Sequence, residues 1–561
     1  MTKTTGAKAI AQMLKAYDVS HIFMVPAVLR RTMAELEAMT EISRLHVHSE
    51  ASAAYMADGY ARASGRPGVC MAQVIGALNL AAGLRDAWLA HSPVIAITGG
   101  RDPSTKFKRV YQEVDDLPAF EPVTKLNATI DNVERIPDML RQAFRAATSG
   151  CPGPVHLQFR GNEGQIDQEE GDMDVFHEAQ HVRSPAYRFP ADSNSVKLAL
   201  EALAKAKKPI FVIGGGARHS AAGLALKSLC EGLNIPFATS LNGKDVIPGS
   251  HPLSVGVVGT YSRESANRAV LAADLVCFVG SETGSMVTNF WKSPKPGARV
   301  IQIDIEPTSL GLNYKLEVSL HGDARTVVEQ LLVELEAGRT LLTDRTQWIL
   351  ECEQYKLQWR TKYQPYFDLE ASPIRPEKLC DALTKTMPDD ALVVVDTGHA
   401  GMWMGGMFDL TNANQGYIRS AGHLGWAFPA SLGAKCAQPN RPVVCFTGDA
   451  GFWYHIAEIE VAVRWGIHSI TVVNNNSGGN QSKRGFDRAY GGQQTEKARE
   501  LWTFRKTDFA AIASSIGAVG FRVESAAELE ATLKKAYLIK APVVIDVVTD
   551  IEALAPVAYS E

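Results

Sequence analysis

Two short polar segments near the end of the chain carry the residue types of a metal-diphosphate site. Segment 448–451 (GDAG) follows the apolar run 442–446 (PVVCF), and three asparagines, 474–476, follow the apolar run 469–473 (SITVV). A carboxylate, an amide oxygen and backbone carbonyls suit Mg²⁺, whose other ligands are water and substrate phosphates. The sequence shows no His/Cys cluster with the spacing of a softer metal site. We therefore expect Asp449 and the asparagines to bind Mg²⁺.

The elements around these segments predict that they lie side by side. Between the two runs, the apolar residues of segment 453–467 recur at helical intervals, which predicts strand, crossover helix and parallel strand in order. Such a crossover is right-handed, so the C-terminal ends of both strands meet at one edge of the sheet. We therefore expect Asp449 to lie beside the cluster 474–476.

With this layout the chain resembles the thiamine-diphosphate enzymes of the acetolactate synthase and pyruvate decarboxylase superfamily. Asp449 and Asn476 match the family's Gly-Asp and Asn at the family's spacing, and Ala450 replaces a glycine, a change also seen in the synthases. The resemblance implies thiamine diphosphate as cofactor and the backbone carbonyl of Gly478 as the third protein ligand of Mg²⁺. It also implies cofactor contacts at Gly398, His399, Gly448, Ala450 and Gly451.

A carboxylate at the other end of the chain adds to the resemblance. Glu50 lies in segment 45–69, which is similar to the family's segment in which a strand ends in His-Glu and a small-residue helix follows. The resemblance implies that Glu50 hydrogen-bonds the aminopyrimidine ring and promotes proton removal from the thiazolium. Alone, it would be an acidic residue in a first helical turn, favoured by the helix dipole. The resemblance also implies contacts of Gly422 with the pyrimidine and of Leu424 with the bent cofactor, although Leu424 could be plain core.

Composition indicates a large globular enzyme. The 561 residues are 46% apolar and carry a net charge of −4, which predicts several cored domains and no nucleic-acid partner. Eight cysteines are scattered without metal-ligand spacing, so we expect reduced thiols. No run is long enough to span a membrane, and the start has no secretory apolar core. We expect a cytoplasmic protein with no membrane partner.

The order of apolar runs predicts an α/β fold of three doubly wound parallel-sheet domains. Polar segments near 164–195 and 340–372 separate them. The expected domains are an N-terminal pyrimidine-binding domain, 1–185, a central nucleotide-binding-like domain, 190–345, and a C-terminal diphosphate- and Mg²⁺-binding domain, 373–561. The two flanking domains resemble thiamine-diphosphate-binding folds.

The central block contains a strand-like run, 208–213, that leads into glycines 214–216. A Gly-rich turn after a strand is either an anion site or a simple turn. In the superfamily, synthases keep FAD in this domain and CoA-dependent members keep an ADP moiety. Whether the central domain binds FAD or an ADP moiety therefore indicates the substrate class.

Details of this block resemble the CoA-dependent branch, which includes oxalyl-CoA decarboxylase and 2-hydroxyacyl-CoA lyase. An Asp at a strand end suits a ribose hydroxyl. Gly215 replaces an expected lysine, and Ser281 and Glu282 stand where an arginine is common; Arg218 could compensate. The alternative is that the aspartates are only turn or helix-cap residues. The residues implied for the ADP or CoA moiety are Arg160, Arg218, Asp304, Ile305, Asp323 and Ala324.

Two further segments bear on the substrate. Tyr111 and Gln112 match a pattern shared by synthases and CoA-dependent lyases, which implies that they face the thiazolium from a neighbouring subunit and stabilise a developing alkoxide; the alternative is an exposed loop. His46 and His48 do not form the adjacent pair of pyruvate decarboxylases. Gln493, in a polar Gly-rich segment after the metal motif, can hydrogen-bond near the substrate hydroxyl but cannot act as an acid or base. A helix N-terminal Gln is the plainer interpretation.

We therefore predict a thiamine-diphosphate- and Mg²⁺-dependent 2-hydroxyacyl-CoA lyase that gives formyl-CoA and an aldehyde or ketone, with 2-hydroxyisobutyryl-CoA as one candidate substrate. The alternatives are an acetolactate-synthase-like carboligase or decarboxylase of 2-keto acids, and a catalytically idle regulatory subunit. The resemblance places Glu50 and the diphosphate site in different subunits, which implies a homodimer or homotetramer. It also compares the tail 551–561 with a lid that closes over the CoA arm.

Overall fold

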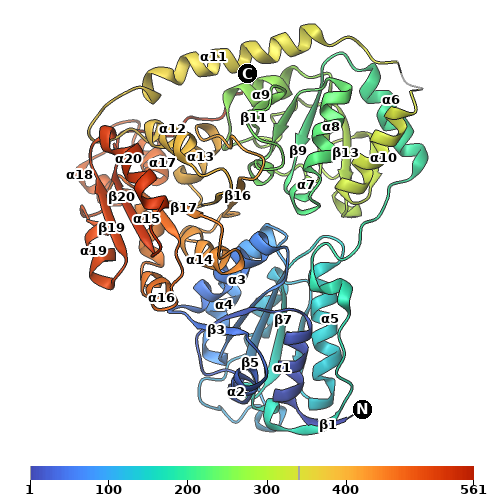
Figure 1. The fold of residues 1–561 in the computed structure, drawn as a ribbon, viewed down its shortest axis with the longest axis vertical. Helices are drawn as coiled ribbons and strands as arrows, with labels where there is room; N and C mark the ends of the chain where they lie inside the picture. Colours follow the sequence, from blue (N-terminus) through green and yellow to red (C-terminus); the bar gives the residue numbers. More distant parts are fainter. Residues whose placement is uncertain (1, 339–340, 561) are drawn as a thin grey trace.

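The structure, a computed structural model, describes residues 2–338 and 341–560. Three six-stranded sheets, all with parallel neighbours, form three lobes (Figure 1). The predicted fold class is confirmed. Among the described residues, no helix has both the length and the apolar character needed to cross a membrane.

The first sheet has the strand order β3-β2-β4-β5-β7-β6. Its C-terminal strand edge carries the loops that lead into α3 and α4. A short antiparallel pair, β1 and β8, lies outside this sheet. The elements of this lobe are β1 Thr2–Thr5, α1 Gly6–Ala16, β2 His21–Met24, α2 Arg30–Met39, β3 Ser43–His46, α3 Glu50–Ser64, β4 Gly68–Ala72, α4 Ala77–Leu89, β5 Val94–Gly100, β6 Asn127–Ile130, α5 Ile136–Thr148, β7 Val155–Arg160 and β8 Glu170–Met173.

The central sheet has the order β11-β10-β9-β12-β13-β14. Its inner strand β9 is buried at every position, as expected of a parallel strand covered on both faces. The elements are α6 Ser193–Lys205, β9 Pro209–Ile213, α7 Gly215–His219, α8 Gly223–Leu233, β10 Phe237–Thr239, β11 Ser254–Val257, α9 Glu264–Ala272, β12 Leu275–Val279, β13 Arg299–Asp304, β14 Leu316–His321 and α10 Ala324–Glu336.

The third sheet has the order β16-β15-β17-β18-β20-β19, and the long helix α11 runs from the central lobe to this one (Figure 1). The elements are α11 Thr346–Phe367, α12 Pro376–Thr386, β15 Leu392–Val395, α13 His399–Gly406, β16 Gly416–Arg419, α14 Ala427–Ala437, β17 Val443–Gly448, α15 Asp449–Tyr454, α16 Glu458–Arg464, β18 Ile470–Asn475, α17 Asn480–Ala489, α18 Glu496–Arg499, α19 Phe509–Ile516, β19 Val519–Val523, α20 Ala526–Tyr537 and β20 Val543–Val548.

The crossover between β17 and β18 differs from the prediction of one helix over 453–467. Two short helices, α15 and α16, form it, with a break at 455–457. The break coincides with contacts to the first lobe: His455 Nδ1 lies 2.9 Å from Ser52 Oγ, and Glu458 Oε1 accepts a hydrogen bond from the His48 N–H at 3.1 Å. These tertiary contacts compete with a continuous helix, so helical periodicity alone could not place the break.

The first and third lobes join through α3 and α14, which lie side by side in Figure 1. Glycines allow the two helices to touch backbone to backbone. A Cβ on Gly59 would lie 2.0 Å from the Ala430 carbonyl oxygen, and one on Gly433 would lie 1.9 Å from the Met56 carbonyl oxygen. This close packing fixes the first lobe against the loop that precedes α14.

Candidate active site

The predicted metal-diphosphate residues lie at the switch point of the third sheet. In the sheet, β16 lies next to β15 on one side and β17 lies next to it on the other. The chain continues from β15 to β16 in one direction and from β17 to β18 in the opposite direction. Open α/β sheets bind ligands at this point, outside the carboxyl ends of the strands. Gly398 and His399 follow β15, and Asp449 follows β17. The sheet topology therefore gathers these residues at one edge.

The side chains of Asp449 and Asn476 accept hydrogen bonds from the same backbone N–H. Asp449 Oδ2 accepts a hydrogen bond from the Gly478 N–H at 3.1 Å, and Asn476 Oδ1 accepts one from the same N–H at 3.0 Å. Asp449 Oδ1 also accepts from the Ala450 N–H at 2.9 Å. The structure thus brings together the three residues expected to bind the metal.

The chemistry of this donor set fits a hard divalent cation. Burial raises the pKa of Asp449 to about 7, so an isolated carboxylate is costly here and a bound cation would stabilise its charged form. Within the described ranges, no group of three or more His, Cys, Asp or Glu side chains could hold a metal. One carboxylate with amide and carbonyl oxygens is the donor set that Mg²⁺ accepts while keeping phosphate ligands.

His399 provides a second indication of a ligand. It begins α13, after Gly398 with a φ of +67°, and both of its ring nitrogens are buried without a hydrogen-bond partner. Burial lowers the pKa of His399 to about 4, so the ring is neutral at pH 7. Buried polar atoms without partners are costly, and an anionic group at this edge could accept the N–H. The residues present therefore fit a diphosphate group.

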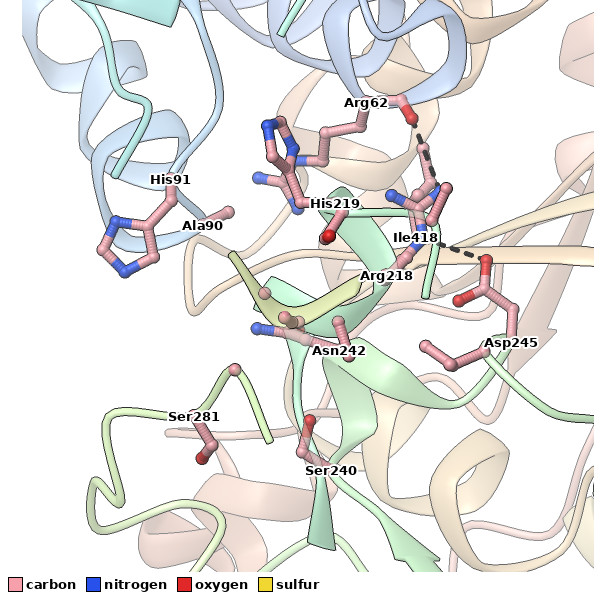
Figure 2. A pocket seen from close by; sticks show the side chains of 18 of the residues that line it. Arg62, Ala90, His91, Arg218, His219, Ser240, Asn242, Asp245, Ser281 and Ile418 are labelled. Atoms are coloured by element: carbon pink, nitrogen blue, oxygen red, sulfur yellow. Dashed lines mark hydrogen bonds and ion pairs between the residues drawn. The ribbon is translucent and has the colours of Figure 1, made fainter. Parts of the chain in front are cut away.

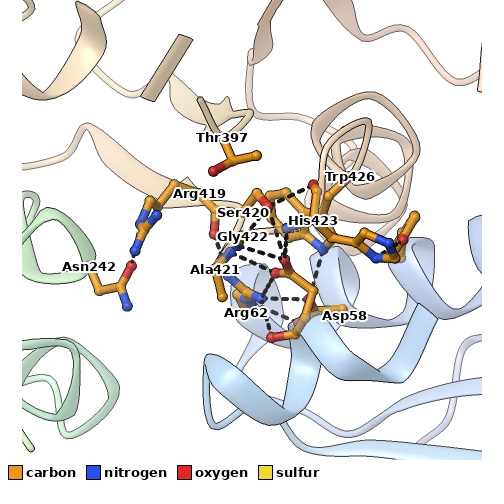
Figure 3. Close-up of polar contacts among 12 residues, drawn as sticks. Asp58, Arg62, Asn242, Thr397, Arg419, Ser420, Ala421, Gly422, His423 and Trp426 are labelled. Atoms are coloured by element: carbon orange, nitrogen blue, oxygen red, sulfur yellow. Dashed lines mark hydrogen bonds and ion pairs between the residues drawn. The ribbon is translucent and has the colours of Figure 1, made fainter. Parts of the chain in front are cut away.

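The loop 420–423, which carries Gly422, is held by a carboxylate of the first lobe (Figure 3). Asp86 Oδ1 accepts a hydrogen bond from the Ala421 N–H at 2.9 Å, and Asp86 Oδ2 accepts from the N–H groups of Gly422 at 3.2 Å and His423 at 3.1 Å. The Ser420 hydroxyl donates to Asp86 Oδ2 at 2.9 Å. One buried side chain thus orients four consecutive residues.

Arg62 connects this carboxylate with a second one. Its guanidinium bonds Asp58 at 2.6 Å and Asp86 at 2.9 Å, and it donates to the Arg419 carbonyl oxygen at 2.6 Å. Trp426 donates its indole N–H to Asp58 at 2.8 Å. Both carboxylates are fully buried, and burial raises the pKa of Asp58. The pairing with Arg62 is what makes two charged groups tolerable at this site.

Beside the loop there is room for a ligand. A Cβ on Gly422 or on Gly448 would meet no atom within 4 Å. Leu424 is half-buried at the end of the loop. Open space next to Gly422 and Gly448 is what the two expected cofactor contacts require.

Glu50 begins α3 and lies at the edge of the first sheet. Its Oε2 accepts a hydrogen bond from Asn79 Nδ2 at 3.2 Å, and a Cβ on Gly76 would lie 2.4 Å from its Oε1. Among the described residues, no hydrogen bond joins Glu50 to the third lobe. The carboxylate is half-buried and has room for one more partner.

A cavity of about 930 Å³ lies where the three lobes meet (Figure 2). The first lobe contributes Arg62 and His91, the central lobe Arg218 and Asp304, and the third lobe Arg419 and Ala421. Its central part faces the switch point of the central sheet, between β9 and β12. The cavity therefore extends from a nucleotide-type sheet edge to the loop that carries Gly422.

Five of the six residues expected to bind ADP or CoA line the cavity, and one does not. Arg218, Asp304, Ile305, Asp323 and Ala324 line the cavity. Burial raises the pKa of Asp304 to about 6, whereas Asp323 caps α10 through the Thr326 N–H at 3.1 Å. Arg218 pairs with Asp245 at 2.9 Å. Arg160 does not line the cavity and pairs with Glu169.

Comparison with known proteins gives three matches in chain order. Residues 4–119 match the N-terminal TPP-binding domain of thiamine pyrophosphate enzymes, 196–331 match the central domain, and 396–547 match the C-terminal TPP-binding domain. The acetolactate synthase large subunit of Haemophilus influenzae is 31% identical over 96% of this chain and 93% of its own length. The chain belongs to the thiamine pyrophosphate enzyme family.

Other relatives share the same extent. Acetolactate synthase isozyme 3 large subunit of Escherichia coli is 30% identical over 96% of this chain and 92% of its own length. The acetolactate synthase large subunit of Corynebacterium glutamicum is 30% identical over 98% of this chain and 88% of its own length. This thiamine pyrophosphate enzyme is therefore similar to them along its whole length and depends on thiamine pyrophosphate.

Three residues expected near the substrate lie on the surface of the single chain of this thiamine pyrophosphate enzyme. Tyr111 is 80% exposed, and Gln112, with a φ of +66°, accepts a hydrogen bond from Gln73 at 3.2 Å. Gln493 is exposed between α17 and α18, where its N–H donates to the Tyr490 carbonyl oxygen at 3.1 Å. Among the residues that the structure describes, no contact assigns these side chains a role.

The tail of this thiamine pyrophosphate enzyme returns to the central lobe. Asn480 Nδ2 donates to the carbonyl oxygens of Ile551 and Ala553 at 3.0 Å, and Asn267 Nδ2 donates to that of Tyr559 at 3.2 Å. None of the described residues after 550 lines the cavity. The tail therefore links α17 with α9 in the structure.

Sequence reasoning missed the polar residues that join the lobes. Asp86 and the pair of Asp58 and Arg62 hold the loop 420–423, and Arg419 donates to Asn242 Oδ1 at 2.9 Å across the cavity wall. The sequence contained one signal for these contacts: Asp58 and Arg62 lie four residues apart in a helix rich in small residues. That spacing predicts an ion pair on a helix face but not its burial against another domain.

Proposed function

We propose that this protein is a thiamine-diphosphate- and Mg²⁺-dependent lyase that cleaves a 2-hydroxyacyl-CoA into formyl-CoA and an aldehyde or ketone. The C–C bond next to the thioester breaks, the hydroxyl carbon becomes the carbonyl of the second product, and a proton replaces it on the formyl carbon. The observation that carries the proposal is the cavity that runs from the central sheet edge to Ala421, beside Gly422. A nucleotide with a long thioester arm needs such a path.

The charges along this cavity support a polyanionic ligand. Arg419 is 7% exposed, and the only hydrogen bond that its guanidinium makes among the described residues goes to the neutral oxygen of Asn242. Arg441 also lines the cavity and bonds only to carbonyl and amide oxygens, including that of Asn414 at 2.6 Å. Arginines without a carboxylate partner are available to phosphate groups. Asp304, at the end of β13, would accept a hydrogen bond from a ribose hydroxyl.

The chain's own residues then have separate tasks. Asp449, Asn476 and Gly478 would hold Mg²⁺, and the neutral His399 would donate a hydrogen bond to a phosphate oxygen. When bound, thiamine diphosphate supplies the electron sink that C–C cleavage requires. Glu50 would hold a proton at the pyrimidine ring. The amide of Gln493 would hydrogen-bond the substrate hydroxyl without exchanging a proton with it.

We further propose that the active site forms between two subunits. Glu50 contacts Gly76 and Asn79, and the neighbouring apolar side chains Ile75 and Leu78 are exposed in the single chain, as is Tyr111. Exposed apolar groups next to a carboxylate with a free position indicate a surface that another copy covers. A second subunit would place its diphosphate site against Glu50 and bury Tyr111 and Gln112. The active unit would then be a homodimer or homotetramer.

The test is titration calorimetry of the protein loaded with Mg²⁺ and thiamine diphosphate. We expect ADP and CoA to bind, and 2-hydroxyisobutyryl-CoA to give formyl-CoA and acetone, detected by chromatography and mass spectrometry. Failure of both nucleotides to bind would overturn the acyl-CoA assignment. If the nucleotides bind but no 2-hydroxyacyl-CoA in a series releases formyl-CoA, the lyase assignment would be overturned and only the nucleotide site would stand.

A second candidate function is supported by the comparisons. The relatives are named acetolactate synthase large subunits, and these names favour a 2-keto-acid carboligase over a CoA lyase. In this alternative the cavity would hold FAD. A flavin absorption spectrum of the purified protein, with acetolactate formed from pyruvate and no binding of CoA, would decide for the carboligase.

A further inference from the structure

A cysteine, a histidine and a glutamate form a chain in the wall of the cavity. Cys151 Sγ lies 3.1 Å from His91 Nδ1, and His91 Nε2 lies 2.9 Å from Glu282 Oε1. Cys151 follows α5 and His91 follows α4, whereas Glu282 comes from the central lobe. All three line the cavity, and Figure 2 labels His91 among the lining residues. Neither the metal-diphosphate site nor the lyase reaction uses them.

The surroundings of the sulfur are cationic. Burial by itself lowers the pKa of His91, but its contacts with Cys151 and Glu282 outweigh burial and raise the pKa to about 10. The contact with His91 lowers the pKa of Glu282 in turn. Lys125 donates to the Cys151 carbonyl oxygen at 2.7 Å, which brings an ammonium group close to the same residue. Cationic neighbours of this kind are typical of nucleophilic cysteines.

Exposure separates this cysteine from six of the other seven. Of the eight free cysteines, six are buried, and only Cys151 and Cys436 are partly exposed. Burial raises the pKa of the Cys436 thiol to about 12, so this side chain is protonated at pH 7. Cys436 is therefore an internal control: its residue is partly exposed, but its thiol is buried and, among the described residues, has no hydrogen bond with a histidine.

We propose that Cys151, His91 and Glu282 form a reactive-thiol site that exchanges with small-molecule disulfides. The Cys151 thiolate attacks one sulfur of the disulfide, the S–S bond breaks, and a mixed disulfide forms on Cys151. The departing thiolate takes a proton from solvent, so no further oxidant or reductant is needed. The inference rests on the three side chains and does not require the proposed lyase activity.

Modification of Cys151 has a consequence for the cavity. The charge of Glu282 raises the pKa of Asp304, and that of His91 lowers it. Asp304 is the residue that we propose accepts a hydrogen bond from a ribose hydroxyl. A group attached to Cys151 would occupy this part of the cavity and separate His91 from its partner. We therefore expect the mixed disulfide and a nucleotide to exclude each other.

The experiment treats the full-length protein, loaded with Mg²⁺ and thiamine diphosphate, with the chromogenic disulfide dithiodipyridine at pH 7. Rates come from thione release, and the modified cysteine is located by peptide mass spectrometry. We expect Cys151 to react at least about tenfold faster than Cys436, because Cys151 has the His91 ring in contact and the Cys436 thiol is buried. The fast phase should disappear in Cys151→Ser and persist in Cys436→Ser. Equal rates at the two cysteines would overturn the proposal.

Two variants separate activation by His91 from simple exposure. His91 has a φ of +52°, which Asn tolerates, so His91→Asn should keep the backbone and lose the imidazolium. We expect the reaction at Cys151 to slow about tenfold in His91→Asn. Unchanged rates in this variant would overturn the proposal. If His91→Asn does not fold, Glu282→Gln decides by the same criterion, because the Glu282 side chain is 52% exposed and its replacement leaves the core intact.

Protection by ADP connects the site with the cavity. Slower modification of Cys151 in saturating ADP would support the placement of both the thiol and the nucleotide. Fast modification that ADP does not slow would support the thiol site and count against the proposed nucleotide position. The rate ratio of Cys151 to Cys436 tests the thiol site in either case.

Discussion

The Asp86 carboxylate, on helix α4 of the first lobe, accepts a hydrogen bond at 3.2 Å from the backbone N–H of Gly422 in the third lobe. The same carboxylate binds Ser420, Ala421 and His423, so it sets the position of the loop expected to meet the pyrimidine ring. Two segments more than three hundred residues apart thus share one buried acid. The geometry of the candidate site depends on how the lobes pack.

Asp86→Asn should weaken cofactor binding and lower stability. The variant removes the charge that balances Arg62, and breaking a buried ion pair costs about 3 kcal/mol or more. Because the loop 420–423 loses acceptors, we expect thiamine diphosphate affinity to fall about tenfold, as for other residues that orient ligands indirectly. Calorimetry and urea unfolding measure the two effects. Ser420→Ala, which removes one bond to Asp86, is the milder control, and an unchanged affinity in Asp86→Asn would refute the positioning role.

Glu50→Gln should abolish turnover without unfolding the protein. The amide cannot hold the proton that the pyrimidine ring requires, and loss of such proton transfer costs about a hundredfold or more in rate. Steady-state kinetics at saturating cofactor is the measurement. Glu41→Gln makes the same chemical change at an exposed position of the same lobe and should leave the rate unchanged. Wild-type activity in Glu50→Gln would refute the catalytic role assigned to Glu50.

Asp449→Asn should abolish the Mg²⁺-dependent activity that we expect of the wild type. The variant keeps the size of the side chain but loses its only carboxylate charge, and hard divalent cations bind weakly to neutral amides. We expect EDTA to inactivate the wild type, with recovery on adding Mg²⁺, and we expect no recovery in the variant. Rescue of Asp449→Asn at millimolar Mg²⁺ would show that the ligands lie elsewhere.

Arg419→Met should weaken nucleotide binding selectively. The guanidinium is buried in the cavity wall and has no carboxylate partner among the described residues. A charged hydrogen bond to a phosphate is worth about 1.5–3 kcal/mol, or roughly ten- to a hundredfold in affinity. Calorimetry with CoA should show this loss, whereas thiamine diphosphate affinity should not change. Arg299→Met, which removes an arginine paired with Glu317 away from the cavity, is the control. Equal CoA affinities in both variants would contradict the assignment.

Stability should depend on pH through Glu458. Burial raises the pKa of Glu458 from near 4.5 to about 7 in the folded protein. The folded state therefore holds a proton that the unfolded state releases, and stability falls as pH rises from about 4.5 through about 7. The full effect is about 3 kcal/mol. Glu458→Gln should flatten this part of the profile in urea unfolding series and stabilise the protein at pH 8; a profile identical to wild type would exclude this source.

Features encoded by neighbouring residues were predictable from the sequence. Apolar runs such as 442–446 and 469–473 predicted parallel strands, and β17 and β18 lie there as neighbours. The right-handed crossover brought Asp449 to Asn476 and Gly478, as the order of elements required. The split of the crossover into α15 and α16 was not predictable, because His455 and Glu458 find partners in the first lobe.

The sequence by itself therefore determined the three parallel sheets and the metal-diphosphate edge, since strand burial, helical period and the sheet-edge rule act over short stretches of chain. Only the tertiary structure decided how the lobes meet. The bond from Asp86 to Gly422, the contact of Arg419 with Asn242 and the chain of Cys151, His91 and Glu282 join residues of different lobes. No local pattern encodes such pairs, because they depend on the packing of whole domains, which α3 and α14 fix through their glycine contacts.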